Sequence, residues 1–119
     1  MRNFRKYDVW LDGIEFVVQT YSTTESFPSD ERFGLTSQMR RSSVSIPSNI
    51  AEGASRKSNT EFSRFIEISI GSSFELETQL IISLRRRYIS QDHLERLLLP
   101  LHSIQRRLNA LRTTLNNGR

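Results

Sequence analysis

Apolar residues recur along this chain at intervals of three and four positions, the spacing that places side chains on one face of an α-helix. The first segment of this kind spans residues 8–23, and Asp8 is positioned to cap its start. Its apolar face contains Trp10, Ile14, Val17 and Tyr21, widened by Val9, Phe16 and Val18. The periodicity is lost at Thr23, and Pro28 disfavours helical backbone at the residue before it. We therefore predict a first helix that ends near Thr23.

A second helix is predicted over residues 35–56, after a break at Gly34. Its apolar positions are Leu35, Met39, Ile46, Ile50 and Ala54. A polar stripe runs beside them, formed by Gln38, Arg41, Ser45, Asn49, Glu52 and Arg56. Pro47 lies inside the segment and lacks an N–H, so a kink with a local cost of up to about 3 kcal/mol is expected. The hydroxyl of Ser43 or Ser45 would partly satisfy the carbonyls that the proline frees.

A third helix is predicted over residues 59–88, and it carries more apolar surface than one flanking layer needs. Ser58 and Glu61 form a capping box at its start. One apolar seam contains Phe62, Phe65, Ser69, Ser72, Leu76 and Leu80. A second contains Ile66, Ile70, Phe74, Ile81, Leu84 and Tyr88. Ile68 lies outside both seams and places apolar surface on a third side of the helix. We therefore expect another subunit to cover part of this helix, which predicts a homo-oligomer.

The strongest periodic signal predicts a fourth helix over residues 91–115, capped by Ser90 or Asp92 and followed by a stop at 116–118. Its repeating positions are Leu94, Leu97, Leu101, Ile104, Leu108, Leu111 and Leu115. Pro100 is expected to bend it near Arg96. Four helices with short connections and no strand pattern predict an all-α protein. We expect an antiparallel up-down four-helix bundle that forms a single domain over residues 1–119.

Composition narrows the setting in which such a bundle works. The chain has no cysteine, which excludes disulfides and cysteine-ligated zinc and fits a reducing cytoplasm. The basic start at residues 1–6 runs into no apolar segment of the kind found in signal peptides. No stretch approaches the roughly 20 apolar residues that span a bilayer. We therefore expect a cytoplasmic protein with no membrane partner.

Charge points to an acidic partner. The formal net charge is +4 and the isoelectric point is about 10.1. Of the 17 basic residues, all but Lys6 and Lys57 are arginine. Guanidinium groups grip phosphate or carboxylate through two parallel hydrogen bonds, so this bias favours either nucleic acid or dense ion pairing.

The basic residues fall into clusters on the predicted second, third and fourth helices. They are Arg40, Arg41, Arg56, Lys57, Arg85, Arg86, Arg87, Arg106, Arg107 and Arg112. Repeated around a symmetric oligomer, they would form a ring or channel for a nucleic-acid backbone. The Arg85–Arg87 run also has a purely structural explanation, because the helix macrodipole favours positive charge at a C-terminus. No aromatic stacking platform is evident, so binding would be salt-dependent and largely indifferent to base sequence.

The sequence gives little support to catalysis or to a cofactor. His93 and His102 are nine residues apart, and neither follows a glutamate by three positions as in di-iron bundles. The serines suit helix caps and close packing, and no nucleophile elbow is present. Four glutamates are better explained as ion-pair partners: Glu52, Glu67, Glu75 and Glu77. The small residues 71–73 lie within a predicted helix, where they would let a neighbouring helix approach closely. We expect neither an enzyme nor a small-molecule substrate.

Several motifs resemble the bacterial four-helix bundle family encoded in intervening sequences of 23S ribosomal RNA genes, whose members are also called S23 ribosomal proteins. They are Phe27-Pro28, Glu31 with residues 33–38, residues 45–53, residues 71–73 and residues 75–80. The resemblance implies a cyclic homopentamer without catalytic activity. It extends more distantly to the accessory protein of diversity-generating retroelements, a basic pentamer that contacts nucleic acid and a reverse transcriptase.

The chain also departs from the family pattern. Ser42, Ser43 and Ser69 stand where the family commonly carries alanine, and the run at 85–87 is more basic than usual. Within the family motif, Ser45, Asn49 and Glu52 are interpreted as a polar network around Pro47, followed by Gly53, with a structural role. A nucleic-acid role must therefore rest on the arginines of this chain.

Two functions remain open at this point. The leading hypothesis is a non-enzymatic, oligomeric scaffold that binds RNA or DNA backbone through an arginine-rich surface. The alternative is a protein-interaction scaffold whose basic residues neutralise an acidic protein partner, with no nucleic-acid role.

Overall fold

The computed structural model describes residues 2–118, which form four α-helices and two short 3₁₀ helices and contain no β-strand. The α-helices are α1 (Asp8–Thr24), α2 (Leu35–Ala54), α3 (Asn59–Arg85) and α4 (Gln91–Asn117). The 3₁₀ helices are η1 (Phe4–Lys6), before α1, and η2 (Ser29–Glu31), between α1 and α2. The predicted all-α fold is confirmed over this part of the chain.

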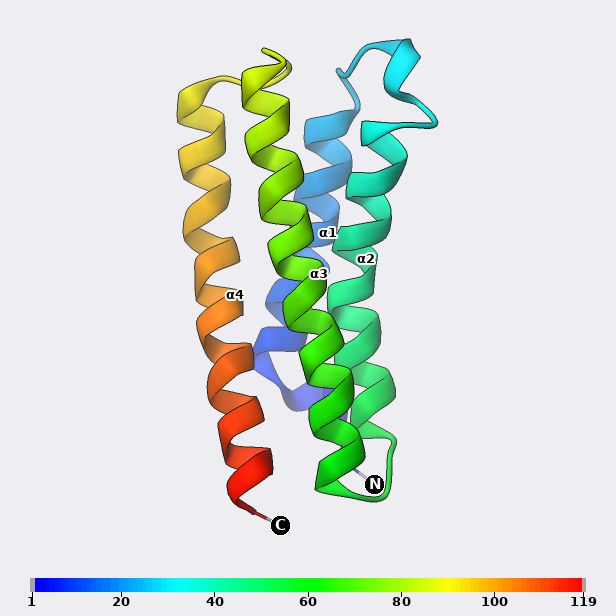
Figure 1. The fold of residues 1–119 in the computed structure, drawn as a ribbon, viewed down its shortest axis with the longest axis vertical. Coiled ribbons are helices and arrows are strands. Elements are labelled where there is room, and N and C mark those ends of the chain that lie inside the picture. Colours follow the sequence, from blue (N-terminus) through cyan, green and yellow to red (C-terminus); the bar gives the residue numbers. More distant parts are fainter. Residues whose placement is uncertain (1, 119) are drawn as a thin grey trace.

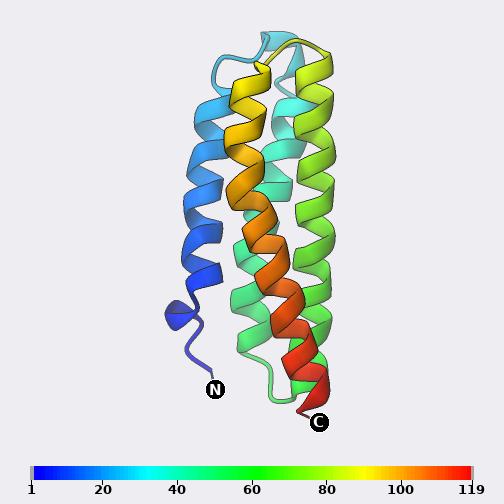
Figure 2. The same cartoon turned by 90° about the vertical axis from the view of Figure 1, so that its left-hand side faces the viewer.

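The helices form an antiparallel bundle in which each packs against its neighbours in the sequence, and α4 closes the ring against α1 (Figure 1). The bundle measures 46 × 24 × 20 Å. The most extensive contact joins α2 and α3, and the sparsest joins α1 and α4. In the side view, α4 starts beside α1 and leans towards the base of α3 as it descends (Figure 2). The up-down four-helix bundle predicted from the sequence is therefore present, with one side more open than the others.

Two of the predicted helix caps are confirmed, and one is wrong. Ser58 accepts a hydrogen bond from the Glu61 amide at 3.1 Å, and Ser90 accepts one from the His93 amide at 3.1 Å. Each serine thereby satisfies an amide that has no partner within its own helix. Asp8 does not cap α1: it is the first helical residue, and Tyr7 occupies the cap position without a side-chain bond.

The predicted second and third helices are each too long at the C-terminal end. The second ends at Ala54 instead of residue 56, and the third at Arg85 instead of residue 88. Arg87 adopts a left-handed backbone with φ of 65°, and the amides of Arg87 and Tyr88 bond back to the carbonyls of Leu84 and Ser83 at 2.9 and 2.8 Å. This paired arrangement is the Schellman motif, which ends a helix by satisfying its last carbonyls.

Both internal prolines lie within continuous helices, Pro47 in α2 and Pro100 in α4. The expected role of the serine hydroxyls near Pro47 is wrong. The Ser43 hydroxyl donates to the Arg40 carbonyl at 2.8 Å, and the Ser45 hydroxyl pairs with the Ser72 hydroxyl at 2.7 Å. Neither reaches the Ser43 carbonyl that Pro47 leaves without its usual donor.

The core face of α1 differs from the predicted one. Its buried positions are Val9, Gly13, Phe16, Thr20, Thr23 and Thr24. Ile14 and Tyr21, expected inside, are each 41% exposed. Threonine suits the core here because Thr20 satisfies its hydroxyl on the Phe16 carbonyl of its own helix at 2.8 Å. Gly13 faces α2, because a Cβ added there would lie 3.4 Å from the Pro47 Cβ, which is an ordinary van der Waals contact.

The core of the bundle is filled by aliphatic and aromatic side chains from all four helices. The fourth helix contributes Leu94, Leu97, Leu101, Ile104, Leu108 and Leu115, while Leu111 is partly buried against them. These residues meet Phe16 of α1, Met39, Ile46 and Ile50 of α2, and Phe62, Ile66, Leu76 and Leu80 of α3. The predicted leucine repeat of the fourth helix is thus the main contribution of α4 to the core.

Candidate functional site

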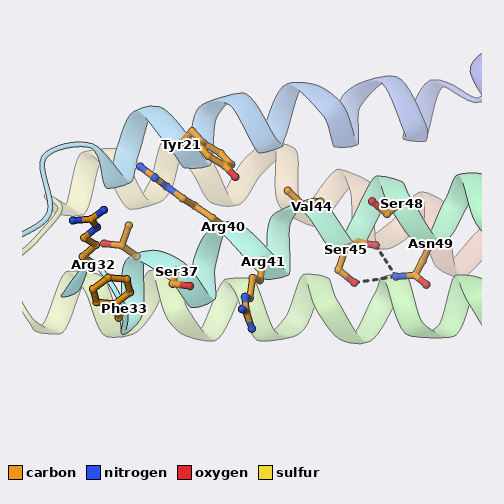
Figure 3. Close-up of a pocket in the computed structure, with 11 residues that line it drawn as sticks. Tyr21, Arg32, Phe33, Ser37, Arg40, Arg41, Val44, Ser45, Ser48 and Asn49 are labelled. Atoms are coloured by element: carbon orange, nitrogen blue, oxygen red, sulfur yellow. Dashed lines mark hydrogen bonds between the residues drawn. The ribbon is translucent and has the colours of Figure 1, made fainter.

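A groove of about 710 Å³ lies on the outer surface of α2, beside the end of α1 and the loop that follows η2. We call it the arginine groove. It is lined by Tyr21, Arg32, Phe33, Thr36, Ser37, Arg40, Arg41, Val44, Ser45, Ser48 and Asn49 (Figure 3). These lining residues include three arginines and no carboxylate. The groove is therefore a positively charged hollow with aromatic and hydroxyl groups in its walls.

The Arg40 side chain is held in place by α1. Its guanidinium carbon lies 4.5 Å from the centroid of the Tyr21 ring, and its Nε donates to the Thr24 hydroxyl oxygen at 2.9 Å. Figure 3 shows Arg40 reaching towards Tyr21, while Arg41 points away from it, towards α3. Arg41 is exposed and forms no hydrogen bond or ion pair within residues 2–118. The groove thus combines one fixed and one free guanidinium on successive residues.

Arg32 and Phe33 lie together at the end of the groove, in the turn between η2 and α2 (Figure 3). Phe33 is 86% exposed, more than any other large apolar side chain of the described residues. The Arg32 guanidinium carbon lies 5.2 Å from the centroid of the Phe33 ring, within the range of a cation–π contact. An aromatic ring with an open face therefore stands beside the arginines, where we had expected no stacking platform.

Glu31 fixes the turn that carries Arg32 and Phe33. One carboxylate oxygen accepts the Leu35 amide at 3.1 Å and the other accepts the Tyr88 hydroxyl at 2.9 Å. The hydrogen bond from the Leu35 amide, the hydrogen bond from the Tyr88 hydroxyl and the positive charge of Arg86 together lower the pKa of the Glu31 carboxyl below its ordinary value. A Cβ on Gly34 would lie 2.8 Å from this carboxylate oxygen, so a larger residue there would require the Glu31 side chain to shift.

The Arg85–Arg87 run sits where α3 ends. Arg86 donates to the Tyr88 hydroxyl oxygen at 3.3 and 3.4 Å, and this contact raises the pKa of its guanidinium. The side chains of Arg85 and Arg87 are exposed and have no hydrogen-bond or ion-pair partner within residues 2–118. The end of α3 that carries them lies at the same end of the bundle as the turn between η2 and α2 (Figure 1).

Arg56 and Lys57 lie at the opposite end of the bundle, just after α2. Together with Arg2 and Ser55 they line a second basic hollow of about 640 Å³. Arg56 is already engaged: it pairs with Glu52 at 3.4 Å and stacks 4.8 Å from the centroid of the Phe65 ring. Lys57 is exposed and has no partner in the described part of the chain.

On α4, two of the three predicted arginines are used within the bundle. Arg107 pairs with Asp12 of α1 at 2.7 Å, and Arg112 lies 3.9 Å from Glu67 of α3. Arg106 alone of the three is exposed without such a partner in residues 2–118. The ten predicted basic residues are therefore not one continuous surface within a protomer, and only Arg40 and Arg41 line the arginine groove.

Ser45 and Asn49 form a hydrogen-bonded network beside Pro47, as predicted, but Glu52 is not part of it. The Asn49 amide donates to the carbonyl and hydroxyl oxygens of Ser45 at 2.8 and 2.9 Å, and Ser45 contacts Ser72 of α3. Glu52 instead pairs with Arg56. A Cβ added to Gly53 would lie only 2.7 Å from the Phe65 Cβ, so this glycine is required where α2 meets α3.

The other groups considered for chemistry have structural contacts. Glu77 accepts from Gln105 at 2.9 Å and lies 3.2 Å from a His102 ring nitrogen, while Glu75 accepts from the Ser42 hydroxyl at 3.0 Å. His93 contacts the Thr23 hydroxyl at 3.0 Å, and partial burial, with Arg96 nearby, lowers its pKa. Among residues 2–118, no three histidine or acidic side chains cluster as metal ligands would. Within the same residues, no helix has the length and apolarity that crossing a membrane requires.

The outward face of α3 is partly apolar, as its sequence indicated. Its exposed large side chains are Ile68, Phe74, Ile81 and Ile82, each between 39% and 52% exposed. Gly71 lies on the same face, and a Cβ added there would meet nothing within 4 Å. Of the small residues at 71–73, Ser73 is buried, Ser72 is half-buried against Ser45 of α2, and Gly71 faces out.

Comparison with known proteins places the chain in a family. The model of the 23S rRNA-intervening sequence protein family matches residues 5–110. The chain belongs to this family. A solved structure from Bacteroides thetaiotaomicron, described as a protein of unknown function from the S23 ribosomal protein family, superposes with a TM-score of 0.82. It is 24% identical, and the match covers 88% of this chain and 95% of that one, which bears on the fold alone. No curated protein matches the chain.

Of the groove arginines and aromatic residues, Arg32 and Phe33 were not assigned to any predicted helix. Both precede the break predicted at Gly34, and neither was considered as a binding residue. A signal was available, because Arg32, Thr36, Arg40 and Val44 follow one another at intervals of four and continue one face of α2 beyond its start. The exposure of Phe33 has no such signal, since apolar periodicity does not show whether a loop residue is covered.

Proposed function

We propose that this member of the 23S rRNA-intervening sequence protein family is a non-enzymatic, oligomeric scaffold that binds the backbone of RNA or DNA. The observation that carries the proposal is the arginine groove, which gathers Arg32, Arg40 and Arg41 with no carboxylate in its lining. Phosphate is the anion that repeats along a chain and so matches several arginines at once.

The state of the three guanidinium groups supports this use. Arg41 needs to break no ion pair to reach a phosphate, and Arg32 contacts only the face of Phe33. Arg40 is held against Tyr21 and Thr24, so little side-chain entropy remains for it to lose on binding. Arg112, by contrast, pairs with Glu67 within the bundle, whereas no carboxylate lies among the residues that line the groove.

The oligomer is proposed from the outward face of α3. Gly71 has open space around it, and an exposed glycine inside a helix costs about 0.5–1 kcal/mol relative to alanine. A second copy of the chain packing closely against Gly71, Ile68 and Ile82 would offset that cost and bury the apolar face. The family resemblance implies five copies in a ring, which would repeat the groove around the assembly.

Titration of fluorescent single- and double-stranded RNA and DNA, at about 50 and 200 mM salt, tests the binding proposal. We expect Arg41→Gln to weaken binding and to make the logarithmic salt dependence shallower by about one unit. Arg96→Gln is the matched control, since Arg96 is an exposed arginine on α4 that lies away from the groove and is not among the predicted binding residues. Absence of binding at the lower salt concentration would contradict the proposal.

Light scattering tests the oligomer. Gly71→Leu adds a large side chain where the protomer has room for it, so each bundle should still fold while assembly is lost. Thr113→Leu adds an apolar side chain to an exposed site on α4 and should leave the assembly intact. A wild-type protein that is monomeric at micromolar concentration would rule out this part of the proposal.

An acidic protein is the competing partner for the same arginines. Its carboxylates would also be drawn to Arg41, but the complex would survive nuclease treatment. Nuclease-sensitive capture of nucleic acid by the wild type, absent from an Arg32→Gln and Arg41→Gln double variant, is the outcome that we expect.

A further inference from the structure

We infer that the arginine groove holds a single nucleic-acid strand, with one unpaired base stacked on Phe33 and the flanking phosphates on Arg32, Arg40 and Arg41. This inference rests on the proposed function and makes it more specific, because backbone binding alone does not distinguish one strand from two. It concerns residues that together span the junction of η2 and α2 and the first turns of α2.

The Phe33 ring is held in an exposed position. Burying a phenylalanine side chain is favourable by about 1.5–3 kcal/mol, yet this ring is 86% exposed while Phe16, Phe27 and Phe62 lie in the core. The Glu31 carboxylate accepts a hydrogen bond from the Leu35 amide, which anchors the turn that carries the ring. Its position is thereby set by the local structure.

The geometry around the ring leaves one side of it open. The Arg32 guanidinium covers one side at 5.2 Å from the centroid, and the exposed fraction leaves the opposite side open. A base stacked there would lie between the ring and solvent, with the Arg32 charge close to the phosphates of the same strand. Aromatic rings with adjacent arginines are the combination by which single strands are bound without base-specific contacts.

Stacking on the Phe33 ring favours a single strand over a duplex as the occupant of the groove. In a double helix the faces of the bases are covered by their neighbours, so only an unpaired base can stack on Phe33. From the ring, the strand would run along α2 past Arg40, fixed by Tyr21 and Thr24, and Arg41, which is free. Figure 3 shows Arg40 and Arg41 following Phe33 along α2, with Ser37 near the Phe33 end of the groove and Ser48 further along, beyond Val44.

Variants of Phe33 separate stacking from charge. Phe33→Leu keeps an apolar side chain but removes the ring. We expect it to weaken binding of a labelled single-stranded oligonucleotide of about ten nucleotides by roughly 5- to 100-fold. Binding of the matched duplex should change little. Leu99→Ala is the control, because Leu99 is also a largely exposed apolar residue but lies on α4, away from the groove and from the apolar face of α3.

A spectroscopic arm reports on the contact directly. Phe33→Trp in a Trp10→Phe background leaves one tryptophan in the chain, and stacking of a base should quench its fluorescence. A Trp10-containing protein without the Phe33 change should show no such quenching, since Trp10 packs near Phe4 at the opposite end. Single-stranded RNA and single-stranded DNA are titrated separately to show which strand is preferred.

The outcomes distinguish this inference from the proposed function. If neither the single strand nor the duplex binds, the proposed function and the single-strand inference are both overturned. If both bind and Phe33→Leu weakens neither, or if the tryptophan is not quenched, the single-strand inference is overturned while backbone binding stands. If Phe33→Leu changes the oligomeric state in light scattering, Phe33 is a subunit contact, and the inference is likewise overturned.

Discussion

The two interfaces made by the middle and the outer helices of this bundle are built in different ways. Between α2 and α3, several small residues lie at the contact, and Gly53 of α2 and Ser69 and Ser83 of α3 are almost fully buried there. Hydrogen bonds cross this interface, including one from Ser69 to the Ile46 carbonyl at 2.9 Å. Between α1 and α4, the side chains are longer and the helices diverge as α4 leans away (Figure 2).

The contacts between α1 and α4 are correspondingly few. The Thr23 hydroxyl meets His93 near the start of α4, and Asp12 meets Arg107 further along. Hollows of about 440 and 210 Å³ lie between these points. The difference teaches that a regular leucine repeat does not predict how closely a helix packs on each neighbour. α4 has the clearest repeat and the loosest contact with α1, whereas the irregular, serine-rich α3 packs closely on α2.

The largest effect is expected when the α2/α3 interface is forced apart. Gly53→Ala would place a methyl group 2.7 Å from the Phe65 Cβ and 2.9 Å from Phe62 Cδ1, so the helices must separate. Overpacking of this kind lowers the free energy of unfolding by about 1–3 kcal/mol. Urea denaturation followed by circular dichroism measures the change.

Gly71→Ala is the matched control for that variant, because the added methyl group meets nothing in the protomer. In the isolated bundle it should raise the free energy of unfolding by about 0.5–1 kcal/mol. Equal losses of stability in the two variants would show that the α2/α3 interface is no tighter than the surface, contrary to the comparison.

A smaller effect is expected at the α1/α4 interface. Asp12→Asn removes the partner of Arg107, but the Arg107 and Asp12 side chains are 35% and 56% exposed, so water screens the pair. We expect a loss of about 0.5 kcal/mol, reduced further in high salt. A double-mutant cycle with Arg107→Gln isolates the interaction, and a coupling well above 1 kcal/mol would mean that α1 and α4 are joined more firmly than their sparse contacts indicate.

The smallest effect is expected from pH, again at the α1/α4 interface. Partial burial and Arg96 lower the pKa of His93 from its ordinary 6.5, so the folded state favours the neutral ring. The stability that this provides is present above the unfolded pKa and is lost as pH falls through the lower, folded pKa. Amide exchange near Thr23 and His93 should quicken towards about pH 5, while exchange in α2 and α3 changes less. In His93→Gln this local pH dependence should vanish, and its persistence would point to another titrating group.

The sequence was sufficient for the helices and their order, because apolar spacing and the serine caps are local signals. It was insufficient for the core face of α1, since Thr20 and Gly13 read as polar or neutral although their helix environment makes them suitable for burial. The end of α3 was missed because a left-handed arginine, unlike a glycine, gives no warning in the sequence. Arg40 and Arg41 of the groove were identified from charge.

The turn after α3 influences the groove although it does not line it. The left-handed backbone of Arg87 reverses the chain, so that the Tyr88 ring settles 5.1 Å from the Phe27 ring and its hydroxyl meets Glu31. Glu31 in turn anchors the beginning of α2. A change in the backbone at Arg87 would therefore displace Tyr88 and, through it, Glu31, the residue before Arg32. The position of the arginine groove thus depends on a turn that lies more than fifty residues further along the chain.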